Sequence, residues 1–568
     1  MEMKKLLYIA FFVATSLFAQ SAVAQVSKQV DVSKDYAPTV EKAQKLAIMP
    51  DMTDTVKMQP EIDYYITPRT YATSLLTENF RPATIAYWDY SHSRPLYLKA
   101  AVGMPLASEV DAYLSTYNKD KGYAMLYANH LGDYRDRYDI SGMKVKDNTS
   151  EMSNRVGTRA GLFLGRRTLE ADIYGDHQLR HRYPMAGERI TFGKMQGKVR
   201  FGDDFTDMSR WNFNIEVGGG LFDHKERASE SQERFLQSDF AVKTSMGKVL
   251  ADKHLLMIHA AYNGYLGEQT LSPYRNNSVM AGLRYGFSGK RTNLIIGADY
   301  YYDKVSEATT SPHHILPYLH LTWQNSTERF VPFVEFNGEL VRHDFASLMY
   351  ENPFFVATAA DAKELAMLPN EVKYNGRIGI GGNLGKGLFS YHLSAELSFA
   401  DDHIYWYADF ANYKFTTAYQ HSLKIDGSMI FRPVRWFEAE FSAGVYAWMN
   451  YDDYYANRPN FESEIDLKFM TRKFKAEIDF GYASAVKWMA NDLYNGDTRA
   501  QDGLPTAGNF YYRKTNGTPT LGVNIEWRIS NRISLFAEAH NLTGSRVYEW
   551  LYYFYDTPQA MLGVKMTF

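Results

Sequence analysis

Residues 560–568 read Ala-Met-Leu-Gly-Val-Lys-Met-Thr-Phe, and this stretch decides the fold. Alternate positions carry apolar side chains, at Leu562, Val564, Met566 and Phe568, whereas the positions between them are mixed and more polar. An alternation of period two is typical of a β-strand with one apolar face. An outer-membrane β-barrel needs such a strand at its end, because its last strand must pair with its first to leave no open edge in lipid. We therefore predict that these four residues belong to the strand that closes a barrel.

The composition favours a membrane protein built from strands. The mean hydropathy is −0.39, and no apolar run after residue 24 approaches the ~20 residues that a spanning helix needs. Aromatic residues nevertheless make up 15% of the chain, with 43 tyrosines and 34 phenylalanines. Many aromatics without long apolar runs are typical of strands that face lipid on one side and water on the other.

The same alternation recurs through the chain. In residues 474–482 the aromatic and aliphatic side chains alternate with Lys475, Glu477 and Asp479. Short turns alternate with longer polar links, such as 133–151, 176–189, 343–370 and 401–419. In outer-membrane barrels the short turns are periplasmic and the long loops are extracellular. Counting back from the terminal strand predicts an all-β, antiparallel, up-and-down transmembrane barrel of about 22 strands, with 20 as the alternative and both termini in the periplasm. The first strand is expected near Leu96.

The beginning of the chain differs from the rest. Lys4 and Lys5 precede an apolar stretch and an Ala-Val-Ala cleavage pattern, which predicts a secretory signal peptide over residues 1–24. Residues 25–91 lack sustained alternation and predict a periplasmic or lumen-lying extension, and residues 92–568 form the predicted barrel. The chain has no cysteine, which excludes disulfides and thiolate metal sites. We expect the protein in the outer membrane of a Gram-negative bacterium.

The last forty or so residues resemble the end of TonB-dependent receptor barrels. Residues 532–543 look like that family's penultimate strand, which runs into an Asn-Leu pair at Asn541-Leu542, and Leu562-Gly563 and Phe568 match its terminal pattern. The resemblance implies a 22-strand barrel and the uptake of a solute. Those receptors carry a plug domain larger than residues 25–91, so we expect a barrel without a recognisable plug. A four-residue stretch, Gln29 to Val32, is too short a pattern to make TonB an expected partner.

The predicted lumen is acidic along one wall. Alternation places these carboxylates on inward-facing rows: Glu438, Glu440, Glu462, Glu464, Asp466, Glu477 and Asp479. An acidic wall favours cations or polyhydroxylated solutes and repels anions. The alternative is that opposite charges pair across strands and merely fill the barrel interior.

No pattern predicts an enzyme, a cofactor or a metal site. The chain has no Gly-x-Ser-x-Gly, and loop clusters such as Asp401-Asp402-His403 and His313-His314 lack the spacing of a known metal site. The net charge of −3 gives no argument for nucleic acid. The expected partners are outer-membrane lipid, the barrel assembly machinery during biogenesis and possible neighbouring outer-membrane proteins or lipoproteins.

Two functions are open at this point. The first is the passage or uptake of a solute across the outer membrane. The second is a non-transporting barrel subunit of a larger assembly that builds barrels, exports proteins or holds surface lipoproteins. A wide barrel without a plug would leak, so in either case residues 25–91, the loops or a partner must occlude it.

Overall fold

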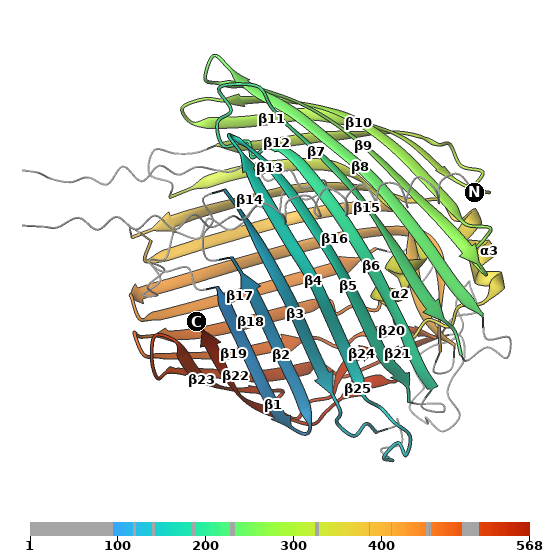
Figure 1. The fold of residues 1–568 in the computed structure, drawn as a ribbon, viewed down its shortest axis with the longest axis vertical. Coiled ribbons are helices and arrows are strands. Elements are labelled where there is room, and N and C mark those ends of the chain that lie inside the picture. The colour runs from blue at the N-terminus through green and yellow to red at the C-terminus, as the bar shows by residue number, and fades with distance from the viewer. Residues whose placement is uncertain are drawn as a thin grey trace, which may run out of the picture. The chain divides into compact units, whose positions relative to one another are not determined.

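The computed structural model describes residues 95–568, except 117–120, 139–142, 184–187, 228–232, 324–328, 386, 410–411, 450–453, 455 and 491–510. The predicted signal peptide and the 25–91 extension therefore lie outside the described residues. The described chain is almost wholly β-structure and forms one large antiparallel sheet (Figure 1).

Long consecutive strands form the wall of this sheet. In chain order they are β1 (Leu96–Met104), β2 (Ala107–Ser115), β3 (Gly122–Asp133), β4 (Glu151–Leu164), β5 (Arg167–Arg182), β6 (Glu188–Asp203), β7 (Asn212–Lys225), β8 (Arg234–Leu250), β9 (His254–Gln269), β10 (Arg275–Ser288), β11 (Thr292–Val305), β12 (His313–Trp323), β13 (Val331–Val341), β14 (Glu371–Leu384), β15 (Phe389–Asp409), β16 (Asn412–Val434), β17 (Phe437–Trp448), β18 (Phe461–Met470), β19 (Phe474–Ala483), β22 (Thr518–Arg528), β23 (Ile533–His540) and β26 (Gln559–Thr567). Four short strands and two helices lie in the longer connections: β20 (Lys487–Ala490), β21 (Tyr511–Lys514), β24 (Val547–Trp550), β25 (Tyr553–Tyr555), α2 (Phe345–Glu351) and α3 (Ala359–Met367).

The wall closes on itself at the terminal strand. β26 pairs with β23 on one side and with β1 on the other, with Leu562 opposite Val102 and Val564 opposite Ala100. The Leu96 N–H donates to the Phe568 carbonyl at 3.1 Å, and the Phe568 N–H donates to the Leu96 carbonyl at 2.9 Å. The large sheet has 24 strands, and leaving out the hairpin β20–β21 gives a closed ring of 22. The predicted 22-strand antiparallel barrel is confirmed.

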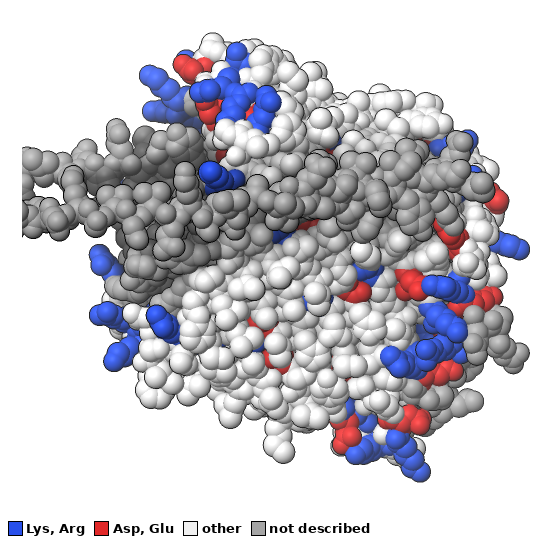
Figure 2. All heavy atoms as spheres, viewed as in Figure 1, with Lys and Arg blue, Asp and Glu red and all other residues white. Residues whose placement is uncertain are grey.

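Along each strand, apolar side chains face outward and polar ones face the interior. On β26 the Leu562 side chain is 70% exposed, whereas Met561 beside it is 4% exposed. The inward Lys565 Nζ lies 2.8 Å from Glu526 Oε2 of β22. The outer face in Figure 2 has few charges across its middle, and its lysines, arginines and carboxylates gather toward both ends. An apolar band with polar ends is the surface expected of an outer-membrane barrel.

Three long links differ in detail from the sequence expectation. Residues 176–189 and 401–419 were expected as loops, but β5 and β6, and β15 and β16, extend through most of them as paired strands. Residues 343–370 contain α2 and α3. Asp344 caps α2 by accepting from the Ser347 N–H, and Thr358 caps α3 in a reciprocal pair with Asp361. These strand ends lie beyond the apolar band, so their outward faces need no apolar side chains, whereas inward side chains such as Ile404 and Trp406 belong to a buried apolar cluster.

Among the described residues, no helix is both long enough and apolar enough to cross a membrane.

The outward position of Leu562 can be tested by charge. Replacing Leu562 with Lys should destabilise the folded barrel by about 2–4 kcal/mol, because a cation near the middle of the apolar band loses its hydration. Leu562→Ala removes apolar surface area without adding a charge. It is the matched control and should lower the stability of the folded barrel by less. Urea unfolding in lipid vesicles, followed by tryptophan fluorescence, measures both. Equal unfolding midpoints for the two variants would contradict the outward assignment.

Candidate functional site

Three connections fold together at one end of the barrel. They are residues 343–370 with α2 and α3, the hairpin β20–β21 and the hairpin β24–β25, and we call them the cap. Helices α2 and α3 lie at the end opposite the C-terminus (Figure 1). Since the C-terminus and the short turns are periplasmic, the cap is extracellular.

A large apolar cluster holds the cap to the inner ends of the strands. The Phe354 and Tyr553 rings stack with centroids 3.5 Å apart, which joins α2's segment to the β24–β25 hairpin. Tyr183, just after β5, packs edge-on against Tyr553 with centroids 5.2 Å apart. The cluster consists of Tyr183, Ile190, Phe192, Phe222, Phe235, Leu271, Tyr274, Val305, Phe345, Ala346, Leu348, Met349, Phe354, Phe355, Ala357, Ala362, Leu365, Ala366, Leu368, Ile404, Trp406, Ala408, Tyr413, Phe415, Trp488, Ala490, Leu551, Tyr552 and Tyr553. Burial of this many aromatic and aliphatic side chains makes the cap a small hydrophobic core.

The cap connects nearly opposite walls of the barrel. Arg182 of β5 donates to the Phe355 carbonyl at 2.9 Å, and Phe355 pairs with Tyr413 of β16 as an isolated bridge. Tyr413 also donates through its hydroxyl to the Leu551 carbonyl at 3.1 Å. In a ring of 22 strands, β5 and β16 are eleven positions apart. The cap therefore crosses the extracellular mouth rather than lying along its rim.

A buried ion pair fixes the cap on the β5 side. The Arg182 guanidinium donates to both carboxylate oxygens of Glu226, at 2.9 and 3.0 Å, and both side chains are 1% exposed. His224 Nε2 lies 3.4 Å from the same carboxylate. Burial alone would raise the pKa of Glu226, but the hydrogen bond from His224 and the charge of Arg182 outweigh it and hold the pKa well below its usual range. Glu226 therefore stays charged and keeps Arg182 aimed at Phe355.

A second set of hydrogen bonds ties the start and end of the α2–α3 segment to β10, β11 and β15. Asn370 donates to Asp303 of β11 at 2.7 Å and exchanges hydrogen bonds with Asn276 of β10. The His343 carbonyl accepts from the Tyr274 hydroxyl at 2.6 Å, and His343 Nε2 lies 2.9 Å from the Asp402 carbonyl. Burial lowers the pKa of His343, although the bond to Asp402 and nearby carboxylates act in the opposite direction.

Below the cap, the structure places all seven predicted wall carboxylates on adjacent strands β17, β18 and β19: Glu438, Glu440, Glu462, Glu464, Asp466, Glu477 and Asp479. They alternate with exposed apolar side chains such as Phe441 and Ile465, so they face the interior.

Some of these carboxylates are neutralised and others are not. Glu438 lies 2.5 Å from Arg432 Nε, Glu440 lies 3.4 Å from Lys468 Nζ, and Glu477 lies 3.1 Å from Lys475 Nζ. Within the described part of the chain, four have no ion-pair partner: Glu462, Glu464, Asp466 and Asp479.

Three carboxylates form one row across the wall. Asp466 is directly opposite Glu440 on one side and Asp479 on the other. Like charges placed opposite each other in a sheet are unfavourable. Cross-strand neutralisation therefore accounts for only part of the acidic wall.

The loop clusters considered as metal ligands do not converge. His403 Nδ1 lies 3.0 Å from Glu371, and His313 Nδ1 is hydrogen-bonded to the Tyr300 hydroxyl at 2.7 Å. No group of three or more His, Cys, Asp or Glu side chains in the described ranges is arranged to hold a metal ion. On the inner row of β23, His540 Nε2 lies 3.9 Å from Glu538 Oε2.

No family model matches the chain, and no curated protein matches it in sequence. Solved structures do match. This is the fold of the TonB-dependent receptor barrels. A copper transporter, OprC, aligns with a TM-score of 0.62 and 12% identity, over 84% of this chain and 81% of that one.

Two further receptors align as well. The FrpB iron transporter from Neisseria meningitidis has a TM-score of 0.63 and 10% identity, over 83% of this chain and 81% of its own. The siderophore receptor PirA from Acinetobacter baumannii has a TM-score of 0.61 and 11% identity, over 83% and 80%. At these identities the likeness establishes the TonB-dependent receptor fold, and the matched structures are described as transporters and receptors.

The cap was not found by sequence reasoning, although part of its signal was present. Thr358-Ala-Ala-Asp361 before an apolar run is a capping-box pattern and predicts a helix start. The sequence carries no signal for the ion pair Arg182–Glu226, because its members are 44 residues apart, at the end of β5 and directly after β7, and these two strands are not neighbours.

The buried ion pair gives a test of the cap. Arg182→Gln or Glu226→Gln should each loosen residues 345–357 by about 3–5 kcal/mol, because each leaves a buried charge without its partner. The double variant Arg182→Met with Glu226→Leu is the matched control and should recover most of the loss. Hydrogen exchange of the 345–357 amides measures all three. If the 345–357 amides exchanged as fast in the double variant as in either single variant, the charge pair would not be what holds the cap to β5.

Acid should loosen the cap through His343. The folded pKa lies below the ordinary value near 6.5, so the cap's stability is complete above pH ~6.5 and falls as the pH decreases toward the folded pKa. His343→Gln keeps a donor for the Asp402 carbonyl and removes the titration. The ratio of wild-type to variant exchange rates in residues 343–357, measured between pH 7 and 5, should rise as the pH falls. A ratio that stays constant would contradict this role.

Proposed function

We propose that this protein is an outer-membrane β-barrel through which a solute passes, and that the cap is the barrier that must move for passage. The observation that carries the proposal is the chain of contacts from Arg182 through Phe355 to Tyr413, which crosses the mouth between nearly opposite walls. A permanently open pore has no use for a hydrophobic core across its entrance. The similar solved structures, described as copper, siderophore and iron proteins, support solute uptake as the role of this fold.

The acidic wall suggests which solutes would pass. Four carboxylates without ion-pair partners in the described residues give one side of the lumen a negative potential. A cation gains from this field, and a polyhydroxylated solute finds hydrogen-bond acceptors along it. An anion of similar size is repelled. We therefore propose cationic or polyhydroxylated solutes as the cargo class.

The proposed partners follow from the fold. The apolar band requires outer-membrane lipid, and a closed ring of strands in that membrane requires the barrel assembly machinery for its insertion. Residues 25–91 are proposed as the periplasmic or lumen-lying extension of a barrel without a recognisable plug. TonB is not assigned as a partner. Neither catalysis nor a cofactor enters the proposal.

The second candidate is a non-transporting barrel subunit of a larger outer-membrane assembly. The buried aromatic character of the cap favours it, because a core such as Phe354 stacked on Tyr553 has the packing of a permanent structure. In this case the barrel would serve as an anchor for neighbouring proteins or lipoproteins.

Current through single molecules in planar bilayers separates the two. The wild type should pass little current. A variant in which residues 345–368 are replaced by a Gly-Ser linker should pass large, stable currents, because it removes the bridge between the walls. Adding Glu464→Gln, Asp466→Asn and Asp479→Asn to that variant should lower its preference for cations over anions.

Two controls make the result decisive. Lys363→Gln with Glu364→Gln changes exposed side chains of α3 and should leave the current of the wild type unchanged. A variant lacking residues 25–91 tests whether that segment occludes the lumen by itself. The two changes are also combined, with the linker in place of residues 345–368 and residues 25–91 deleted. If this combined variant still passes no current, and other outer-membrane proteins co-purify with the wild type, solute passage is wrong and the anchoring role holds.

A further inference from the structure

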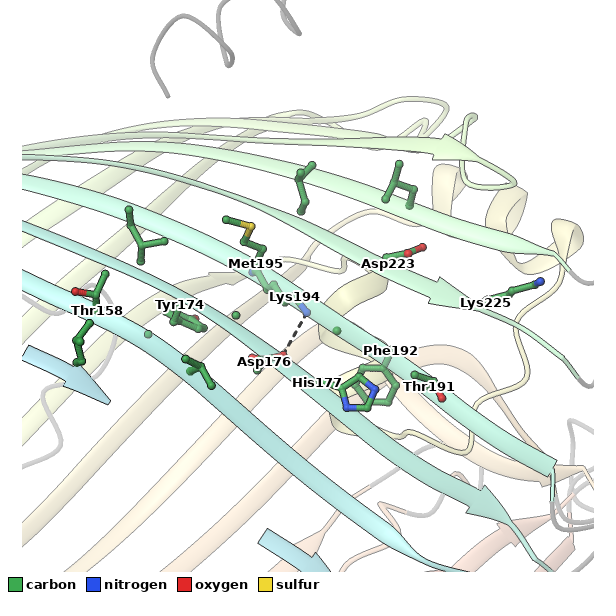
Figure 3. A pocket seen from close by; sticks show the side chains of 18 of the residues that line it. Thr158, Tyr174, Asp176, His177, Thr191, Phe192, Lys194, Met195, Asp223 and Lys225 are labelled. Carbon is green, nitrogen blue, oxygen red and sulfur yellow. Dashed lines mark hydrogen bonds between the residues drawn. The ribbon is translucent and has the colours of Figure 1, made fainter. Parts of the chain in front are cut away.

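The outer wall of the barrel carries a groove that the solute pathway does not use. It lies across β3 to β8, and its volume is about 860 Å³. Figure 3 shows it from close by, with Asp223 and Lys225 nearer the cap end of the strands than Met195. The outward-facing side chains that line it include Val156, Ile173, Met195, Leu221, Asp223 and Lys225.

Glycines on neighbouring strands form the floor of this groove. Gly175 of β5 is opposite Val156 on one side and Met195 on the other, and Gly193 of β6 is opposite His177. A glycine leaves the backbone itself as the surface, so these positions are lower than the side chains around them. A Cβ added at Gly193 would come within 2.6 Å of the Asp176 carbonyl oxygen, whereas one at Gly175 would have its nearest neighbour at 4.0 Å.

The groove lies where the apolar band ends. Toward the cap, the outward-facing side chains change from apolar to polar. On β5 the apolar Ile173 is followed by the polar His177, and on β7 the apolar Leu221 is followed by the charged Asp223 and Lys225. Ile173 lies six residues from the periplasmic start of β5, at Arg167. The inner part of the groove is therefore at the depth of acyl chains, and its outer part is at the depth of the head groups of the outer leaflet.

The outer rim has an excess of positive charge. Lys225 and Arg227 are exposed, and neither has an ion-pair partner in the part of the chain that the structure describes. Arg234 is also exposed, but Asp223 neutralises it at 2.8 Å. Among the described side chains of this rim, Lys225 and Arg227 are therefore two cations without an ion-pair partner next to an apolar groove.

We propose that this groove holds a phosphorylated, acylated lipid of the outer leaflet. An acyl chain lies over Gly175 and Gly193 against Ile173 and Met195, and a phosphate of the head group binds Lys225 and Arg227. An ammonium and a guanidinium are the side chains that bind phosphate most strongly in proteins. A zwitterionic phospholipid also carries a phosphate, but its own ammonium group offsets that charge, so the two cations attract it less strongly.

The test uses the full-length protein in detergent with purified lipid A as the probe, and native mass spectrometry counts the bound lipid. Lys225→Gln with Arg227→Gln should weaken binding by about thirtyfold, since each cation near a lipid surface contributes roughly one factor of five or six. Gly175→Leu fills the floor at a position that has room for a side chain and should weaken binding by about tenfold. Lipid A without its phosphates should bind the wild type as weakly as lipid A binds the charge variant.

A matched control has the same charge change elsewhere. Arg275→Gln with Lys304→Gln removes two exposed cations at the cap end of β10 and β11, away from the groove, and should leave lipid A binding unchanged. The shift of the folded barrel on an unheated denaturing gel verifies that each variant is folded. Equal affinity of the wild type and the charge variant, or equal affinity for lipid A with and without phosphate, would overturn the proposal. So would an unchanged affinity in folded Gly175→Leu.

Discussion

A peptide group in lipid has no water to bond with, so every strand of this barrel must be paired on both sides. The pairing of β26 with β1 meets that requirement, through the mutual hydrogen bonds of Leu96 and Phe568. Once the ring is closed, each strand has one face toward lipid and one toward the interior. The alternation of side chains along the whole chain follows from this single constraint.

The sequence was sufficient for the wall because its signal is local. Alternation needs only neighbouring residues, and the terminal strand around Leu562 carries it fully. The sequence does not predict the extended ends of β5 and β15, because strands beyond the membrane no longer need an outward row of apolar side chains. Their pairing is visible only when the partner strand is known.

For the acidic wall too, the sequence predicts what is local to one strand and not what depends on its neighbour. The inward direction of Asp466 follows from its own strand, but its neutralisation depends on the register of the next one. Register places Lys468 opposite Glu438 and Glu477, whereas it places Asp466 opposite Glu440 and Asp479. One shift of two residues would have paired these charges differently. The cap was harder still, because its contacts join segments from both halves of the chain.

Those contacts also fix the order in which the molecule assembles. The cap needs Arg182, Phe355, Tyr413 and Tyr553 together, and these residues are spread over most of the described chain. Closing such long loops has an entropic cost that is repaid only when all the distant segments have arrived. The cap can therefore complete its core only after the chain as far as Tyr553, just before the last strand, has reached the extracellular side.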